Sequence, residues 1–314
     1  MKIAFLLYPT ASVKIDEDSS FWIMLELKKR GHEVFYFESR RLEWSHSSPH
    51  AALTRARLHP KKGYLPSAFG RQAADLSEMD CIFIRKEPPF DTEYLYALDM
   101  LEAVKDKVFV LNDPQGIAMA NEKLFALSFK KYAPETLVTQ NIASAKSFIK
   151  DLNVKVVIKP LHQKGGVGIF ASSFRDENLP SILERATNLE KERVLIQRFV
   201  SARKYGDKRI VILNGEILGA FIRRPPRHDF RANLSVGGSM HKASVNAWDE
   251  KLVEEMTPKL LSYGLFFVGI DVIGRYLTEV NVTSPAGIPE INHFNKTHLE
   301  KSVVNFIERR LGKR

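Results

Sequence analysis

The sequence predicts an α/β fold in which an open, mostly parallel sheet precedes a region of antiparallel strands. Through the first third of the chain, apolar runs typical of strands alternate with helical patterns, and this order is typical of a parallel sheet. Farther along, Asn214-Gly215 joins two apolar runs, and this dipeptide is the strongest short signal for an antiparallel hairpin. The chain has 314 residues, 44% of them apolar, which is enough for about two domains of roughly 150 residues.

The first third is expected to contain four strands and two helices. The first helix is expected to have Ser19 or Ser20 as its N-cap and to close at Gly31, and Asp91 is expected to cap the second. The stretch from about 40 to 75 is basic, contains His and Ser, and is expected to be irregular. The four strands are expected at residues 2–8, 34–37, 81–85 and 108–111.

The rest of the chain is expected to change from this rhythm to antiparallel pairing. A helix is expected to start at Asn121, and another to end near residue 191. Residues 224–242 contain Pro225-Pro226 and Gly237-Gly238 with little periodicity, which predicts a long mobile loop with a functional role. The strands are expected at residues 154–159, 167–172, 194–200, 210–213 and 216–221.

Charge, the length of the apolar runs and the cysteine count exclude several classes of function. The 47 basic and 37 acidic residues give a net charge of +10, which attracts anions, but the basic residues are spread along the chain, so nucleic-acid binding is not expected. The apolar runs are too short for a membrane span, and the N-terminus does not read as a secretory signal, so a cytoplasmic protein without membrane contact is expected. Cys81 is the only cysteine and is expected to pack in the core.

Residues 266–281 are the most informative segment because they read as two strands joined by a tight turn. If the turn is the three residues 274–276, Asp271 pairs with Glu279 and Asn281 lies opposite Gly269. The three polar side chains then share one face, and they are the oxygen ligands that Mg²⁺ takes beside phosphate and water. A two-residue turn would put Asp271 and Glu279 on opposite faces and favour an ordinary polar surface.

Basic residues and glycines in other segments of the chain are candidates for binding phosphate. Lys159 ends an apolar strand, and Gly165 and Gly166 follow in a loop where backbone N–H groups can approach phosphate closely. Taken alone, this loop fits a plain β-turn better, because it matches neither a P-loop nor a dinucleotide fingerprint. Arginine forks suit phosphate and carboxylate, although a single arginine is more often a surface charge. The arginines of the antiparallel region and loop are Arg209, Arg223, Arg224, Arg227 and Arg231.

Several segments, taken in order, resemble those of the bacterial glutathione synthetases, which are ATP-grasp carboxylate-amine ligases. The resemblance covers nearly the whole chain, and the Arg-Lys-Glu-Pro-Pro-Phe-Asp stretch points to this branch rather than to ATP-grasp enzymes in general. The matching segments are residues 18–21, 85–91, 121–125, 134–139, 159–160, 206–209, 269–271 and 277–285.

The resemblance implies an ATP-grasp fold with an N-terminal open parallel-sheet, Rossmann-like domain. Residues 1–120 would form this pre-ATP-grasp domain that binds substrate, residues 121–200 the small ATP-grasp lobe, and residues 201–314 the C-terminal lobe. The lid would be the loop at about 224–242. A homo-oligomer is also implied.

The resemblance further implies a role for each site residue. Mg²⁺, for which Mn²⁺ can substitute, would be bound by Asp271, Glu279 and Asn281. ATP would be bound by Lys123, Lys159, Gly165, Gly166, Gln197, Arg198, Phe199, Val200 and Asp207, with Asp207 on the ribose. Catalytic charge would come from Arg209, Arg223 and Arg231. Substrates would contact Ser19, Ser20, Arg85, Asn233, Ser284 and Pro285.

The implied reaction joins γ-glutamylcysteine to glycine through an acyl phosphate, giving glutathione, ADP and phosphate. An alternative is a ligase of the same build that acts on another peptide or amino-acid pair. Departures from the family's pattern motivate it, because a hydroxyl and a cation are absent near the acceptor region; they include His162, Gln163, Ala286 and Pro289. A protein that binds nucleotide without catalysis is disfavoured by the complete set of metal ligands.

Overall fold

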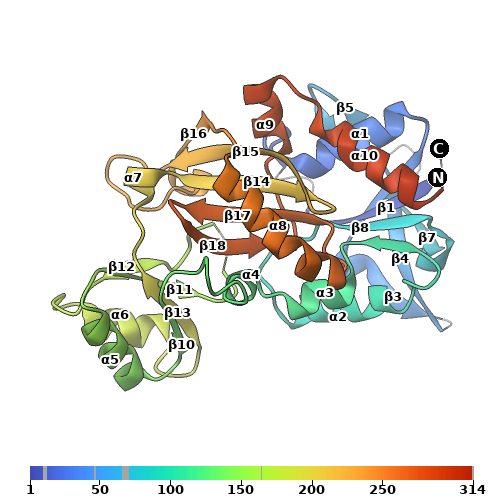
Figure 1. The fold of residues 1–314 in the computed structure, drawn as a ribbon. Coiled ribbons are helices and arrows are strands. Elements are labelled where there is room, and N and C mark those ends of the chain that lie inside the picture. Colours follow the sequence, from blue (N-terminus) through green and yellow to red (C-terminus); the bar gives the residue numbers. More distant parts are fainter. Residues whose placement is uncertain (10–12, 46, 66–70, 164, 313–314) are drawn as a thin grey trace.

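The computed structural model describes residues 1–9, 13–45, 47–65, 71–163 and 165–312. They form three main sheets, and Figure 1 shows the N-terminal sheet on the right, the C-terminal sheet in the centre and a smaller lobe at the lower left. The α/β fold class is confirmed, with a parallel sheet first and antiparallel sheets after it.

The N-terminal sheet has a parallel centre of four strands in the order β2-β1-β8-β9. The strands are β1 (Lys2–Leu7), β2 (Glu33–Glu38), β8 (Cys81–Ile84) and β9 (Phe109–Leu111). Its helices are α1 (Ser19–Lys29), α2 (Thr92–Glu102) and α3 (Pro114–Met119). Cys81 is fully buried in β8, as expected, and burial raises the pKa of its thiol.

The cap of α1 differs from the expectation. Asp18, not Ser19 or Ser20, is the N-cap, because its Oδ1 accepts hydrogen bonds from the backbone N–H groups of Ser20 (2.6 Å) and Phe21 (3.1 Å). The two serines are therefore the first helical residues, and their hydroxyls are available for other partners. Asp91 caps α2 as expected.

The described residues between 40 and 75 extend the sheet with antiparallel strands, so the expectation of an irregular stretch is wrong there. β4 alternates buried and half-buried residues, but its buried positions are Pro49, Ala51 and Leu53, and such small or strand-breaking residues give a weak strand signal. The strands are β3 (Leu42–Ser45), β4 (Ser48–Arg55) and β7 (Arg71–Asp75), with a separate small pair of β5 (Leu58–His59) and β6 (Gly63–Tyr64).

The small lobe is an antiparallel sheet in the order β10-β13-β11-β12, packed against two helices around its own core. The strands are β10 (Thr136–Thr139), β11 (Val156–Pro160), β12 (Phe170–Ser172) and β13 (Val194–Arg198). The helices are α5 (Ile142–Leu152) and α6 (Leu179–Ala186), and α4 (Glu122–Ala126) precedes the lobe. Asn121 caps α4 as expected, whereas β10 and α5 were not expected.

The C-terminal sheet is antiparallel in the order β16-β15-β14-β17-β18. The strands are β14 (Asp207–Leu213), β15 (Glu216–Arg224), β16 (Ser239–Lys242), β17 (Phe267–Ile273) and β18 (Tyr276–Asn281). The helices are α7 (Ala202–Tyr205), α8 (Ala247–Ser262), α9 (Ile288–Asn295) and α10 (Leu299–Arg310). The Asn214-Gly215 hairpin is confirmed, with positive φ angles of 51° and 84°.

The predicted loop at 224–242 is partly regular. β15 runs as far as Arg224, residues 234–236 form a 3₁₀ turn, and β16 pairs with β15 at the far end of the segment. The loop is therefore tied to the sheet at both ends, and its middle contacts the glycine-bearing loop.

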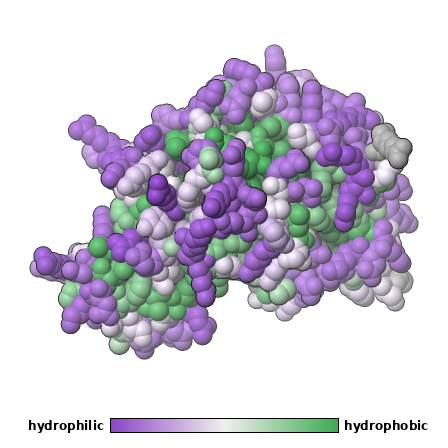
Figure 2. Space-filling view, in the orientation of Figure 1, coloured by the Kyte–Doolittle hydropathy of each residue, from purple (hydrophilic) through white to green (hydrophobic). Residues whose placement is uncertain are grey.

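The N-terminal and C-terminal sheets share buried cores, and one side chain joins them directly. Asn112, directly after β9, donates from Nδ2 to the carbonyl oxygens of Phe267 (2.8 Å) and Val282 (3.0 Å) and accepts from the Phe267 N–H. Hydrophilic residues cover most of the face in Figure 2. No helix in the described part of the chain is long and apolar enough to cross a membrane.

Candidate active site

The β17–β18 hairpin turns through two residues, Gly274 and Arg275, because Ile273 pairs with Tyr276. The expected three-residue turn is therefore wrong. A register shift between Asp271 and Val272 absorbs one extra residue, so Asp271 still pairs with Glu279 and Gly269 with Asn281. The Thr278 hydroxyl donates to the Asp271 carbonyl oxygen (3.1 Å) at this bulge. The two carboxylate residues are thus paired across the strands as expected, by a different backbone route.

The other face of the hairpin is apolar. Val268, Ile270, Val272, Val280 and Val282 are all at most 2% exposed, as the alternation predicts. Burial of these five residues fixes the register, because a slip by one residue would move them to the polar face.

Asp271 forms ion pairs with two arginines, Arg209 and Arg223. Arg209 binds it with two hydrogen bonds, Nε to Oδ1 (2.6 Å) and Nη2 to Oδ2 (2.9 Å), and Arg223 Nη2 lies 3.0 Å from Oδ1. All three side chains are buried. Burial opposes ionisation of Asp271, but the two guanidinium groups outweigh it and lower the pKa of this carboxyl. Asp271 is therefore an ionised carboxylate at neutral pH.

Asp207 and Arg223 form a second buried pair, with Nη2 2.6 Å from Oδ2. Burial raises the pKa of Asp207, the Arg223 charge opposes this, and the negative charge of Asp271 adds to it. The positive charge of Arg223 thus bridges the carboxylates of Asp207 and Asp271.

Lys123, on α4, connects the β17–β18 hairpin to the glycine-bearing loop. Its Nζ lies 3.2 Å from Glu279 Oε1 and donates to the carbonyl oxygen of Gln163 (2.7 Å). Asn281 lies close to Asp271, with Nδ2 3.4 Å from Asp271 Oδ2 and 3.3 Å from the Gly269 carbonyl oxygen. Asp271 and Glu279 line the cavity between the lobes.

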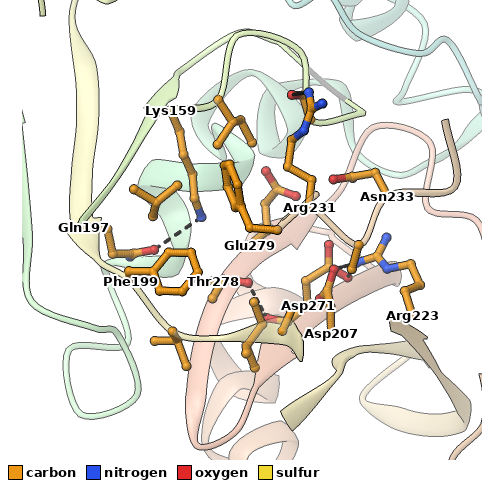
Figure 3. A pocket seen from close by; sticks show the side chains of 18 of the residues that line it. Lys159, Gln197, Phe199, Asp207, Arg223, Arg231, Asn233, Asp271, Thr278 and Glu279 are labelled. Atoms are coloured by element: carbon orange, nitrogen blue, oxygen red, sulfur yellow. Dashed lines mark hydrogen bonds and ion pairs between the residues drawn. The ribbon is translucent and has the colours of Figure 1, made fainter. Parts of the chain in front are cut away.

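Lys159 comes from the opposite wall, where β11 ends. Figure 3 shows it reaching across the cavity, and its Nζ lies 3.3 Å from Gln197 Oε1. Burial lowers the pKa of this lysine, the Glu279 charge opposes the shift, and the Lys123 charge adds to it. An anion placed in the cavity would favour the charged form of Lys159.

The loop from 224 to 242 lies closed on the glycine-bearing loop. Arg231 Nη1 donates to the Gly166 carbonyl oxygen (2.9 Å) and is paired with Asp229, and Ser235 Oγ donates to the Gly165 carbonyl oxygen (2.8 Å). Gly166 has φ of 81°, and a Cβ there would lie 2.8 Å from Asn233 Oδ1. Both the conformation and the close approach require glycine.

The end of the cavity away from the carboxylates is largely apolar. Gln197, Arg198, Phe199 and Val200 line it from β13 and the residues that follow. Arg198 points elsewhere with its guanidinium, which binds Glu135 through two hydrogen bonds of 2.7 and 2.6 Å. Further lining comes from Val157, Ile169, Ala202, Phe230 and Ile273.

The expected substrate residues of the N-terminal domain form a separate buried cluster. Arg85 donates from Nε to Ser20 Oγ (2.9 Å) and from Nη2 to the Pro285 carbonyl oxygen (2.8 Å). Ser19 Oγ accepts from the backbone N–H groups of Gly287 and Ile288, both at 3.2 Å. Arg85 Nη1 has no hydrogen-bond partner among the described residues, so this cluster contains one buried donor that is not satisfied.

Asn233 does not join this cluster; it lines the main cavity. Ser284 is half-buried next to Pro285. Sequence reasoning missed other polar groups at the site. Glu122, beside the expected Lys123, accepts from Thr283 Oγ1 (2.7 Å), and Glu290 is buried with Oε2 unpaired among the described residues. Glu122 lies within the matched segment 121–125 and Glu290 lies five residues after the segment 277–285, so their places near matched segments were the available signal.

Two family models match the chain. Residues 1–118 match the "Prokaryotic glutathione synthetase, N-terminal domain" and residues 122–296 the "Prokaryotic glutathione synthetase, ATP-grasp domain". A glutathione synthetase of Gloeobacter violaceus is 39% identical over 315 residues, covering 98% of this chain and 96% of that protein. One of Mesorhizobium japonicum is 36% identical over 294 residues, covering 94% of each.

Solved structures with similar folds are more distant in sequence. The D-cycloserine synthetase DcsG has a TM-score of 0.68 at 12% identity and covers 97% of this chain and 99% of its own. D-alanyl-alanine synthetase A from Vibrio cholerae has a TM-score of 0.63 at 15% identity, and the match covers 99% of this chain and 98% of that one. At these identities the likeness concerns the fold.

The antiparallel lobes and the charged cavity between them define an ATP-grasp enzyme, an ATP-dependent ligase. The matches to both family models and to nearly full-length relatives identify the branch. The chain belongs to the prokaryotic glutathione synthetase family.

Proposed function

We propose that this protein is a glutathione synthetase that joins the carboxyl group of γ-glutamylcysteine to the amine of glycine, with conversion of ATP to ADP and phosphate. Membership of the family and the names of its relatives support the activity. The observation that carries the site is the pairing of Asp271 with Glu279 across β17 and β18, facing Lys159 on the other lobe.

The residues present fit a magnesium site. Two carboxylates and a carboxamide lie on one face of adjacent strands, and Asp271 is ionised. The described residues hold no cluster of three or more His, Cys, Asp or Glu that would bind a metal alone, so phosphate oxygens would complete the coordination. Asp271, Glu279 and Asn281 would hold Mg²⁺, which supplies positive charge to the phosphate oxygens. The ATP-grasp ligase PsnB, with TM-score 0.65, was solved with Mg and ADP.

Cations surround the position where a triphosphate would lie. Lys123 and Lys159 reach it from two walls, Gly165 and Gly166 present backbone from a third, and Arg231 closes it from above. Glu279 and the Gln163 carbonyl oxygen hold Lys123 in place. We propose that these cations bind the phosphates, while Arg209 and Arg223 neutralise charge on the phosphoryl group as it is transferred.

The apolar end of the cavity would take the nucleoside. We propose that residues 197–200 lie beside the adenine and that Asp207 binds the ribose. The dipeptide would be held by Ser19, Ser20, Arg85 and Asn233, together with Ser284 and Pro285. Arg85 supports this role because its free Nη1 needs an acceptor, and a substrate carboxylate supplies one.

The reaction requires activation of a carboxylate, because its carbon resists attack by an amine. The γ-phosphoryl group of ATP passes to the dipeptide carboxylate, which forms an acyl phosphate and releases ADP. The glycine nitrogen then attacks the acyl carbon, the amide bond forms, and phosphate leaves. Water would destroy the acyl phosphate, so the lid at 224–242, hydrogen-bonded to Gly165 and Gly166, has to exclude it.

A ligase acting on another pair of substrates remains the second candidate because of residues 286–290, where Ala286 and Pro289 supply neither a hydroxyl nor a cation. A coupled ADP-release assay across dipeptide and amino-acid pairs tests both. Turnover with γ-glutamylcysteine and glycine is expected; turnover only with another pair would replace the substrate assignment and leave the ligase intact. The homo-oligomeric state and the cytoplasmic location stay predictions, and sedimentation measures the first.

A further inference from the structure

The first half of the lid is held by a residue to which the site description gives no role. Arg203, on α7, places Nη2 within 3.0 Å of the Pro226 carbonyl oxygen, 3.1 Å of that of Arg227 and 2.8 Å of that of Asp229. Arg224 Nη1 in turn donates a hydrogen bond to the Arg203 carbonyl oxygen (3.4 Å). One guanidinium thus gathers three carbonyls of a segment that contains no strand or helix of its own.

The residue next to this anchored segment is Phe230, and its ring closes the apolar end of the cavity. The centroids of the Phe230 and Phe199 rings are 5.9 Å apart, with an interplanar angle of 66°. Both residues line the cavity, and Lys155 Nζ lies 4.8 Å from the Phe199 ring centroid. The lid therefore contributes Phe230 to the apolar end of the cavity, where the ring contacts Phe199.

The two halves of the lid have different anchors. Arg231 and Ser235 bind the glycine-bearing loop, on the phosphate side of the cavity. Arg203 binds the backbone that leads into Phe230, and α7 directly follows the β13 segment that lines the apolar end. A change at Arg203 should therefore act on the nucleoside side of the cavity and leave the phosphate side intact.

We propose that Phe230 binds the purine nucleoside of ATP as a lid-borne wall of the site, and that Arg203 is the positioning residue that holds Phe230 there. An aromatic ring against a base buries apolar area and adds an edge or stacking contact. Arg203 makes all three contacts through Nη2, so the two N–H groups of this nitrogen are shared among the three carbonyl oxygens. A lysine carries the same charge on a shorter, flexible stem, so it should replace Arg203 only in part. The inference rests on the proposed function, since it takes ATP as the ligand.

The test is the affinity for MgADP, measured by calorimetry without the other substrates. Phe230→Ala and Arg203→Ala are each expected to raise the dissociation constant about three- to tenfold, and Arg203→Lys about half as much on a logarithmic scale. The double variant is expected to be no weaker than Phe230→Ala, because Arg203 acts through Phe230. Lys204→Ala removes an exposed cation from the same helix, one that lies over Tyr205, and is the matched control.

Several results would overturn the proposal. They are an unchanged MgADP affinity in Arg203→Ala, an additive loss in the double variant, or an equal loss in Lys204→Ala. In turnover, Arg203→Ala should raise KM for ATP by the same factor, with kcat within about twofold and KM for the other substrates unchanged. A fall in kcat alone would instead assign Arg203 to the phosphate side.

The failure of this inference and that of the proposed function can be told apart. A wild-type protein that binds MgADP but does not ligate γ-glutamylcysteine and glycine would refute the substrate assignment and leave the binding series valid. A wild-type protein that does not bind MgADP would refute both. The melting temperatures of the variants show whether they are folded, which is expected because Arg203 is exposed.

Discussion

The two walls of the active site differ in how they are held. On the C-terminal sheet, Asp271, Arg209 and Arg223 are each at most 8% exposed, and both arginines bind Asp271. The neighbours of Asp271 on the other face of its strand, Ile270 and Val272, are buried. On the other wall, the glycine-bearing loop and the lid meet through two hydrogen bonds to backbone carbonyls. The first wall is preorganised charge in a low dielectric, whereas the second is formed by two loops that hydrogen bonds hold together.

The difference separates residues that bind substrate from residues that also hold the fold. Glu279 faces the cavity with 26% of its side chain exposed, whereas the Asp271 side chain is 5% exposed and ion-paired. Both are proposed metal ligands, yet their removal should have different consequences. Variants at these two positions therefore test the comparison most directly.

The largest effect is expected for Glu279→Gln. It removes one charge from the proposed metal site, so kcat should fall by about 10²- to 10³-fold or more, while the free energy of unfolding changes by less than about 1 kcal/mol. Lys123 keeps its bond to the Gln163 carbonyl oxygen, which limits the structural effect. ADP release and urea unfolding measure the two quantities. Glu216→Gln, on the same sheet, is the control, and wild-type kcat in Glu279→Gln would refute the metal assignment.

Asp271→Asn should lose stability as well as turnover. The change leaves Arg209 and Arg223 buried without the carboxylate that neutralises them, and breaking a buried pair in this way costs about 3–5 kcal/mol. We expect a loss near the lower end, because Asp207 still pairs with Arg223. Urea unfolding measures it. Equal stability of the Asp271 and Glu279 variants would show that the two carboxylates are held alike, contrary to the comparison.

The sequence predicts the rigid wall better than the wall that the two loops form. The pairing of Asp271 with Glu279 was predicted from an assumed three-residue turn; it is confirmed although the turn has two residues, because the bulge at Thr278, which has no sequence signal of its own, restores the register. The contact of Ser235 with Gly165 joins residues 70 apart, and periodicity carries no information about such a contact. The arginines were expected near phosphate, but their binding to Asp271 depends on strand order, which local patterns do not give.

Glu290 belongs to the rigid side and should make stability depend on pH. Burial raises the pKa of its carboxyl to about 7, and the charges of Arg209 and Arg223 oppose this only in part. The unfolded chain releases the proton near pH 4.5 and the folded chain near pH 7, so stability falls as pH rises between them and is then constant.

Glu290→Gln should remove this penalty. The variant is expected to match the wild type near pH 4.5 and to be more stable by about 1–3 kcal/mol at pH 8. Urea unfolding at several pH values measures the difference, with the exposed Glu254→Gln as control. A gain that is the same at every pH would show that Glu290 does not titrate in this window.

The smallest effect is expected on the wall that the two loops form, from Ser235→Ala. The change removes one exposed hydrogen bond to the Gly165 carbonyl oxygen, and such a bond contributes about 0.5–1.5 kcal/mol. Because Arg231 still binds Gly166, we expect KM for ATP to rise about two- to fivefold, with no change in the free energy of unfolding. Ser239→Ala is the matched control, since that hydroxyl contacts His241 within β16 and not the glycine-bearing loop. A loss of stability in Ser235→Ala without a change in KM would mean that the lid is part of the rigid fold, and the two walls would then be held alike.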